Sequence, residues 1–251
     1  TLLFDKAAHV LDEVTCGQPT IGLRVPRHVA ALDILRIMKT KAVEGEPVGI
    51  AAPSANPHTK MSPTTAHHVL KGLGGKIPLI LDGGWCDIGM ESTIIDPGSN
   101  PVRILRAGDI TPEDVRRVLD ADERTRGIEV VLVGKHAEAL PGNMKAHYQV
   151  DKPTFLKSSD KLNFSLRANP SARVAVLHYS EGFVPREYPN GFFRRLSVDR
   201  KGYQRDFFMA LDEASVADVE QIWIEKPPKG EVWAAVWQHL NRAEHPEVLG
   251  A

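Results

Sequence analysis

Cysteine is nearly absent from the sequence, whose 251 residues include only Cys16 and Cys86. The two are not spaced as CxxC, and no Cys/His ligand spacing accompanies them, so a structural zinc site is not expected. Such sparse cysteine is typical of free thiols in a reducing cytosol. We therefore expect a cytoplasmic protein without a resident metal.

Long apolar runs and a charge excess of either sign are also missing. No apolar stretch approaches the length that crosses a bilayer, and no charged and apolar leader opens the sequence, so membrane association is not expected. The formal net charge is −1. Because a nucleic-acid scaffold usually carries a strong basic excess, weak or no direct binding of nucleic acid is expected.

Hydrophobic periodicity predicts alternating strands and helices in the first half of the chain. Strands are expected over 19–26, 47–52, 77–82, 91–96, 102–106 and 128–133. One helix is expected over 28–44, and a second begins at an N-cap Ser62 and ends at about Lys71. A third begins at a near capping box at Thr111 and runs through Leu119.

The second half of the chain predicts a separate α/β unit. Strands are expected over 173–178, 192–198 and 220–225, and helices over 203–216 and 230–243. The residues expected on the buried helix faces are Phe207, Phe208 and Leu211 in the first helix and Val232, Ala235, Val236 and Leu240 in the second. Strands that alternate with helices favour a parallel sheet.

The stretch 138–170 is long, mixed and rich in proline and lysine, so it is interpreted as an inter-domain linker. This interpretation divides the chain into a first domain over 1–137, the linker, and a second domain over 171–251.

Small polar residues gather in three loops at predicted strand ends, 53–62, 83–92 and 106–112. In open α/β sheets ligands bind outside the strand ends, and loops of Ser, Asn and Gly leave backbone N–H groups accessible to phosphates and carboxylates. Arg24 and Arg106 lie within or at the end of strands, where two guanidinium groups can clamp an anion. The pattern therefore predicts an anion site at these loops.

Each of these features also has a purely structural interpretation. A strand arginine is commonly a solvated edge residue, Ser62 can be only an N-cap, and Glu91 can be a buried structural carboxylate. No Ser-His-Asp arrangement and no cysteine nucleophile is visible, so no catalytic side chain is predicted.

A succession of motifs is more specific than any one of them. In order the motifs read TIGLRVPRH (20–28), IAAPSAN (50–56), SPTTAHHV (62–69), LILDGG (79–84), GMESTIID (89–96), ILRAGDIT (104–111) and IWIEKPPKGEVWAAVWQHLNRAEH (222–245). This succession resembles the YrdC-like threonylcarbamoyl-AMP synthase family in its two-domain form. The resemblance implies an α/β fold, a YrdC-like open twisted sheet with helices plus a smaller Rossmann-like α/β domain.

The resemblance also implies an enzyme, a nucleotidyltransferase that makes L-threonylcarbamoyladenylate from L-threonine, bicarbonate and ATP. Mg²⁺ would be held mainly by the phosphates of ATP. Downstream tRNA-modifying partner proteins would then pass the threonylcarbamoyl group to an adenosine next to the anticodon. By the same resemblance, the residues that would face ATP are Thr20, Ser54, Asn56, Ser62 and Arg106.

The threonine substrate would be bound by Arg24 and Ser92, with the backbone around Ala52. His147 and Tyr148 resemble the His-Tyr pair of the family's inter-domain linker, although the residues after them differ from the family's Ala-Pro. These assignments follow from the resemblance alone.

The sequence departs from the family at its beginning. The family's first portion carries a Thr-rich strand and a Lys-x-Arg-Pro segment that grips the ATP phosphates, and neither is present here. The resemblance thus implies an N-terminally truncated YrdC-like domain with weak or no synthase activity on its own. Two alternatives are a non-catalytic RNA-binding or translation-associated module, and a carbamoyl-transfer relative, whose zinc-finger and acylphosphatase-like modules have no counterpart in this sequence.

Overall fold

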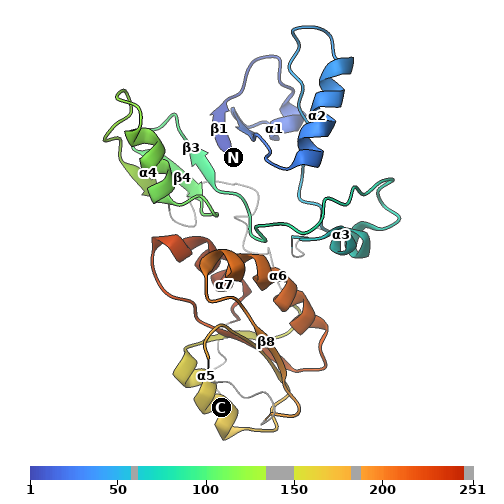
Figure 1. Ribbon diagram of the computed structural model, residues 1–251, viewed down its shortest axis with the longest axis vertical. Coiled ribbons are helices and arrows are strands. Elements are labelled where there is room, and N and C mark those ends of the chain that lie inside the picture. The colour runs from blue at the N-terminus through green and yellow to red at the C-terminus, as the bar shows by residue number, and fades with distance from the viewer. Residues whose placement is uncertain (58–61, 134–149, 182–187, 246–251) are drawn as a thin grey trace.

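A computed structural model describes residues 1–57, 62–133, 150–181 and 188–245. Within these ranges the chain forms two α/β units, each built on one sheet (Figure 1). The first unit runs from blue to green in the figure and the second from yellow to red.

The first unit has a mixed sheet with the strand order β2-β1-β3-β4-β5. Its strands are β1 (Leu2–Asp5), β2 (Thr20–Leu23), β3 (Ile94–Asp96), β4 (Val102–Arg106) and β5 (Val130–Leu132). β1 is antiparallel to β2 and parallel to β3, which is antiparallel to β4, while β4 and β5 are parallel. It follows that β2 and β4 run in the same direction and end at the same edge of the sheet.

In the described part of this unit, four helices accompany the sheet: α1 (Asp12–Thr15), α2 (Val29–Lys41), α3 (Ala66–Leu73) and α4 (Pro112–Asp120). The core of the unit lies between α4 and the strands β4 and β5, where Val102, Ile104, Val115 and Val130 form one buried cluster. α4 begins at a complete capping box, in which the Thr111 side chain accepts from the Asp114 backbone N–H and the Asp114 side chain accepts from the Thr111 backbone N–H.

The Thr111→Ala substitution is expected to lower the free energy of unfolding by about 1 kcal/mol, because it removes the N-cap acceptor and the hydroxyl that also donates to Asp114 at 2.7 Å. Urea denaturation measures the effect. The Glu123→Ala substitution, at an exposed position beyond the helix, is the matched control and should stay within about 0.5 kcal/mol of the unsubstituted chain. Equal midpoints for the two variants would contradict this role of the cap.

The second unit has a parallel sheet with the strand order β6-β9-β7-β8. Its strands are β6 (Thr154–Lys157), β7 (Val174–His178), β8 (Phe192–Arg195) and β9 (Gln221–Glu225). Its helices are α5 (Ser159–Ala168), α6 (Arg200–Val216), the 3₁₀ turn η2 (Glu231–Trp233) and α7 (Ala234–Ala243). β7 is buried along its whole length, as a parallel strand covered on both faces must be.

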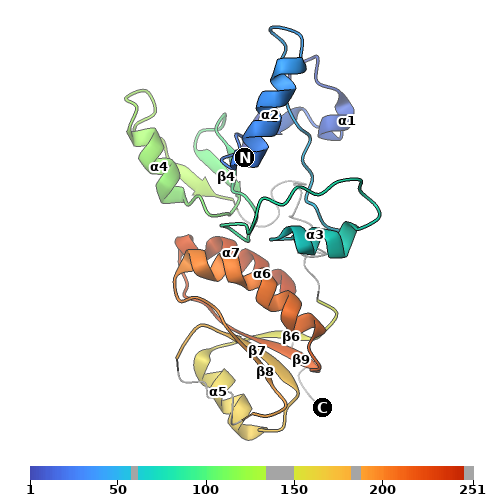
Figure 2. The same ribbon diagram turned by 45° about the vertical axis from the view of Figure 1, so that its right-hand side comes forward.

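Side chains alternate between the two faces of this sheet. On β7, Val174 and Val176 join the cluster of α5, whereas Ala175 and Leu177 join the larger cluster of α6 and α7. Figure 2 shows α5 on the outer face and α6 and α7 on the face toward the first unit. The two helices therefore stand between the second sheet and the first unit.

Most predicted elements are present, with shorter ends. The structure confirms strands within 19–26, 102–106, 128–133, 173–178, 192–198 and 220–225, and helices within 28–44, 111–119 and 203–216. The expected strand 91–96 is reduced to its last residues, since β3 begins at Ile94. No helix in the described parts of the chain is both long and apolar enough to cross a membrane.

Two predicted strands, 47–52 and 77–82, are wrong. Neither segment pairs with another in the described residues, and their apolar side chains are exposed: Ile50 is 48%, Leu79 69% and Leu81 60% exposed. A short apolar run predicts a buried strand only where a neighbouring strand supplies hydrogen bonds on its flank. In the first sheet the two edge positions are occupied by β2 and β5, and neither 47–52 nor 77–82 pairs with them.

Three further corrections concern local detail. The N-cap of α3 is Thr65, whose side chain accepts from the His68 N–H at 3.2 Å, and not Ser62. Val232 is 48% exposed rather than on the buried face, because the 3₁₀ turn before α7 buries Trp233 in its place. β1, which no pattern predicted, occupies an interior position of the first sheet.

The interpretation of 138–170 as a linker is wrong in its second half. β6 pairs in parallel with β9, and α5 packs Leu162 and Leu166 into the core of the second unit. The strand was missed because its short sequence, TFLK, alternates between buried and half-buried residues and ends in lysine.

Candidate functional site

A cluster of polar side chains surrounds Arg106 at the end of β4. Arg106 is only 5% exposed, and its Nε donates to the Ser92 carbonyl oxygen at 2.9 Å. Its Nη2 donates to Ser92 Oγ at 3.0 Å, and its Nη1 lies 3.5 Å from Glu91 Oε2. One guanidinium thus fixes both the backbone and the side chain of Ser92, two residues before β3 begins at Ile94.

A second guanidinium reaches the same place from β2. Arg24 follows β2 directly, and its Nε donates to Thr1 Oγ1 at 2.6 Å. Thr1 Oγ1 lies 3.1 Å from Ser92 Oγ, so two hydroxyl groups bridge Arg24 to Arg106. The convergence follows from topology, since β2 and β4 end at the sheet edge where β1 and β3 begin. We call Thr1, Arg24, Glu91, Ser92 and Arg106 the arginine cluster.

The electrostatics of the arginine cluster favour an anion. Burial lowers the pKa of the Arg106 guanidinium, Glu91 opposes the shift, and the positive charges of Arg24 and Arg242 add to it. Burial lowers the pKa of His239 to about 3, with Arg242 and Arg106 adding to the shift, so its imidazole is neutral near pH 7. The two guanidinium groups of the cluster and the nearby Arg242, against the one carboxylate of Glu91, leave a net positive charge, which suits a carboxylate or phosphate.

Two loops that support the arginine cluster interlock behind it. Thr93 is buried and its Oγ1 donates to the Ile110 carbonyl oxygen at 2.9 Å. A Cβ at Gly108 would lie 2.2 Å from the Thr93 nitrogen and 2.7 Å from the Glu91 carbonyl oxygen. The backbones of 91–93 and 107–110 are therefore packed as closely as a glycine allows.

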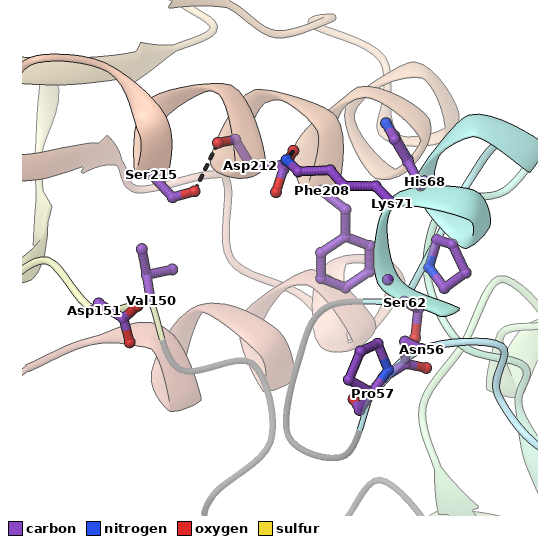
Figure 3. Close-up of a pocket in the computed structure, with 12 residues that line it drawn as sticks. Asn56, Pro57, Ser62, His68, Lys71, Val150, Asp151, Phe208, Asp212 and Ser215 are labelled. Atoms are coloured by element: carbon purple, nitrogen blue, oxygen red, sulfur yellow. Dashed lines mark hydrogen bonds and ion pairs between the residues drawn. The ribbon is translucent and has the colours of Figure 1, made fainter. Parts of the chain in front are cut away.

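A separate pocket of about 290 Å³ lies between the two units (Figure 3). From the first unit it is lined by Asn56, Pro57, Ser62, Pro63, His68, Lys71 and Gly72, and from the second by Val150, Asp151, Phe208, Asp212 and Ser215. Lys71 Nζ lies 3.2 Å from Asp212 Oδ2 and joins α3 to α6. Phe208, the prolines and Val150 give the pocket an apolar wall, and the hydroxyl and amide groups give it hydrogen-bonding partners.

The structure separates the other predicted residues into different places. Thr20 opposes Asp5 at the start of β2, three residues before its end, so it stands apart from the arginine cluster. Ala52 and Ser54 are exposed on the segment that forms no strand. His147 and Tyr148 lie outside the described residues. Of the predicted binding residues, Arg24, Ser92 and Arg106 come together in the arginine cluster.

Several residues near the arginine cluster were not predicted from the sequence. Thr1 belongs to the unpredicted strand region, and Arg242 and His239 come from α7 in the second unit. No local pattern could connect α7 with Arg106, because they are brought together only by the packing of the two units. Met90 could have been recognised from the sequence. A large apolar side chain within a loop of small and polar residues indicates that the loop packs against a hydrophobic core.

The arginine cluster does not fit a protein-bound Mg²⁺. Its one carboxylate, Glu91, faces the Arg106 guanidinium, whereas Mg²⁺ prefers an octahedron of oxygen ligands. No group of three or more His, Cys, Asp or Glu side chains suited to a metal occurs in the described ranges.

The structure thus combines two α/β units with a cluster of guanidinium and hydroxyl groups at one sheet edge. Two family descriptions match the chain. Residues 1–108 match the family described as "Telomere recombination", and residues 110–244 match "Threonylcarbamoyl-AMP synthase, C-terminal domain". The chain belongs to the threonylcarbamoyl-AMP synthase family.

Individual relatives agree with this assignment. The threonylcarbamoyl-AMP synthase of Schizosaccharomyces pombe is 41% identical over 92% of this chain and 58% of its own length. That of Bacillus subtilis is 36% identical over 94% of this chain and 66% of its own. The chain thus spans about three fifths of the length of these relatives.

A solved structure has the same fold. The crystal structure of P. abyssi Sua5 complexed with L-threonine superposes with a TM-score of 0.75 at 27% identity, over 96% of this chain and 69% of that one. The expected fold class, an open YrdC-like sheet with helices plus a smaller Rossmann-like α/β domain, is confirmed.

Proposed function

We propose that the chain carries the L-threonine site of a threonylcarbamoyl-AMP synthase, which makes L-threonylcarbamoyladenylate from L-threonine, bicarbonate and ATP with release of pyrophosphate. The observation that carries the proposal is the bridging of Arg24 and Arg106 through the hydroxyls of Thr1 and Ser92. The family membership and the similarity to a protein crystallised with L-threonine support it.

The proposed chemistry needs positioning and charge neutralisation rather than a protein nucleophile. The carboxylate of L-threonine pairs with a guanidinium, and its side-chain hydroxyl exchanges hydrogen bonds with Ser92. The amino group attacks the carbon of bicarbonate and water leaves, which gives a carbamate. A carbamate oxygen then attacks the α-phosphorus of ATP, the bond to the β-phosphate breaks and pyrophosphate leaves, so the protein acts as a nucleotidyltransferase. Arg106, which contacts Ser92 and is assigned to ATP, would stand where the two substrates meet.

We propose that the nucleotide lies toward the pocket lined by Asn56 and Ser62. Mg²⁺ would arrive with the triphosphate, because the described residues offer no carboxylate cage. A cytoplasmic location, and transfer of the product to tRNA by partner proteins, belong to the same proposal. We place the domain boundary within 134–152, which gives β6 and α5 to the second domain.

Arg24→Ala is the substitution that tests the proposed threonine site with least disturbance of the fold, since Arg24 is exposed. We expect it to weaken L-threonine binding about 10-fold or more in calorimetry, because a hydrogen bond to a charged group is worth about 1.5–3 kcal/mol. The ATP-dependent conversion of radiolabelled bicarbonate to threonylcarbamoyl-AMP is expected to be weak or absent in the unsubstituted chain, and any measured conversion should fall in parallel.

Arg27→Ala is the matched control for Arg24→Ala. Arg27 is an exposed arginine three residues further on, and it pairs with Asp87 at 3.4 Å. Its loss should leave L-threonine affinity unchanged within about twofold. Equal affinities in the two variants, or no binding of L-threonine by the unsubstituted chain, would overturn the proposed function.

A further inference from the structure

Helix α6 of the second unit lies directly against the loop that precedes β3. A Cβ at Gly89 would lie 2.5 Å from the Gln204 carbonyl oxygen and 2.9 Å from that of Arg205. The backbone of the loop therefore rests on the backbone of α6, at a distance that only glycine permits.

The next residue anchors the loop more deeply. Met90 is 6% exposed and belongs to the hydrophobic cluster of the second unit, together with Tyr203, Phe207 and Phe208 of α6. A side chain of the first unit thus completes the core of the second. Glu91 and Ser92 of the arginine cluster follow it immediately in sequence, so the position of Met90 limits where they can lie.

The loop after β4 is held by the same helix. Arg200, the first residue of α6, has its Nη1 2.9 Å from Asp109 Oδ1 and donates to the Asp109 carbonyl oxygen at 3.2 Å. Both side chains are largely buried, at 19% and 17% exposed. Ala107 packs against the core of the second unit, directly after Arg106.

The loops next to Glu91, Ser92 and Arg106 are therefore each fastened to α6 within one to three residues of these side chains. Figure 2 shows α6 and α7 on the face of the second unit that is turned toward the first. The charge of Arg242, on α7, also acts on Arg106 and Glu91. The contacts with the second unit are thus placed at the arginine cluster itself.

We propose that the second unit positions the arginine cluster, with Met90 and Arg200 as positioning residues that hold 91–93 and 106–109 in register. This inference rests on the proposed function for its consequence, the binding of L-threonine. It gives the second unit a role in that reaction, exerted through Glu91, Ser92 and Arg106 without direct contact between Met90 or Arg200 and the substrate.

The test compares Met90→Ala and Arg200→Ala with matched controls in the full chain. Leu156→Ala removes a similar apolar side chain, 5% exposed, from the same cluster but on the strand β6. Arg194→Ala removes an ion pair between β8 and α6 within the second unit, at 3.4 Å from Glu213. Hydrogen exchange is measured by mass spectrometry over 88–94 and 106–111, and L-threonine affinity by calorimetry.

In Met90→Ala and Arg200→Ala we expect faster hydrogen exchange in the peptides 88–94 and 106–111. We also expect L-threonine affinity to be about tenfold weaker, because a displacement of about 1 Å is costly for a preorganised site. Met90→Leu, which keeps the volume, should restore both readouts. The two controls should leave local exchange unchanged and affinity within about twofold, even where Leu156→Ala lowers the melting temperature as much as Met90→Ala does.

Two outcomes separate this proposal from the proposed function. The positioning role would be overturned if Met90→Ala and Arg200→Ala showed the same hydrogen exchange and the same L-threonine affinity as the controls. If the unsubstituted chain binds no L-threonine, the proposed function fails, and the comparison of exchange rates in the two loops decides the positioning role alone.

Discussion

Replacing Arg106 by alanine is expected to weaken binding of L-threonine about 100-fold or more. The substitution removes two hydrogen bonds to Ser92 and the ion pair that neutralises Glu91, each worth about 1.5–3 kcal/mol. It also leaves a largely buried carboxylate without that partner, beside the place proposed for the substrate carboxylate. The free energy of unfolding should fall by about 3 kcal/mol for the same reason.

Two companion variants make the Arg106→Ala result specific. Arg103 lies on the same strand, pairs with Asp96 at 2.6 Å and is 39% exposed, so Arg103→Ala should change affinity less than about twofold. Arg106→Lys keeps the charge but has a single nitrogen in place of the three that contact Ser92 and Glu91, and it should not restore binding. Calorimetry and urea denaturation measure the set. Affinity retained in Arg106→Ala would show that this guanidinium does not hold the substrate.

The Gly108→Ala substitution is expected to reduce L-threonine binding by about 100-fold without touching a charged group. Its new Cβ would lie 2.2 Å from the Thr93 nitrogen, and because the neighbours are backbone atoms, the loops 91–93 and 107–110 must move apart. Gly108 does not have a positive φ, so the effect comes from contact and not from backbone strain. A displacement of about 1 Å is enough for a loss of this size.

Gly98→Ala is the control for this prediction. Gly98 also lacks a positive φ, and the nearest atom to its new Cβ would be Asp96 Oδ1, at 3.6 Å, an ordinary contact. Its affinity for L-threonine should equal that of the unsubstituted chain. If Gly108→Ala binds as well as Gly98→Ala, the tight packing of the two loops is not required for the site.

The sequence predicted those parts of the fold that depend on local chemistry. The capping box at Thr111 and Asp114 specifies the start of α4, and the apolar run of β7 specifies a strand buried on both faces. The runs 47–52 and 77–82 gave the same signal but form no strand, because whether an apolar run is buried depends on its neighbours.

In the candidate site, too, some features follow from local sequence and others depend on how distant segments pack. Arg24 and Arg106 could be named from their strand positions and Ser92 from the family resemblance, and the sheet brings the three together. Their closeness depends on β1 lying between β2 and β3, which no periodicity predicted. The contacts of Met90 and Arg200 with the other unit depend on how the units pack, and this is not visible in any segment alone.

The most direct test of the proposed site is an NMR titration of the ¹⁵N-labelled chain with L-threonine. The proposal predicts that the largest shifts fall on the Arg24 and Arg106 Nε–H signals and on the backbone amides of Ser92 and Thr93. It also predicts that they are lost in Arg106→Ala. Saturable shifts confined to other parts of the chain, or no shifts at all at millimolar L-threonine, would contradict the placement of the substrate at the arginine cluster.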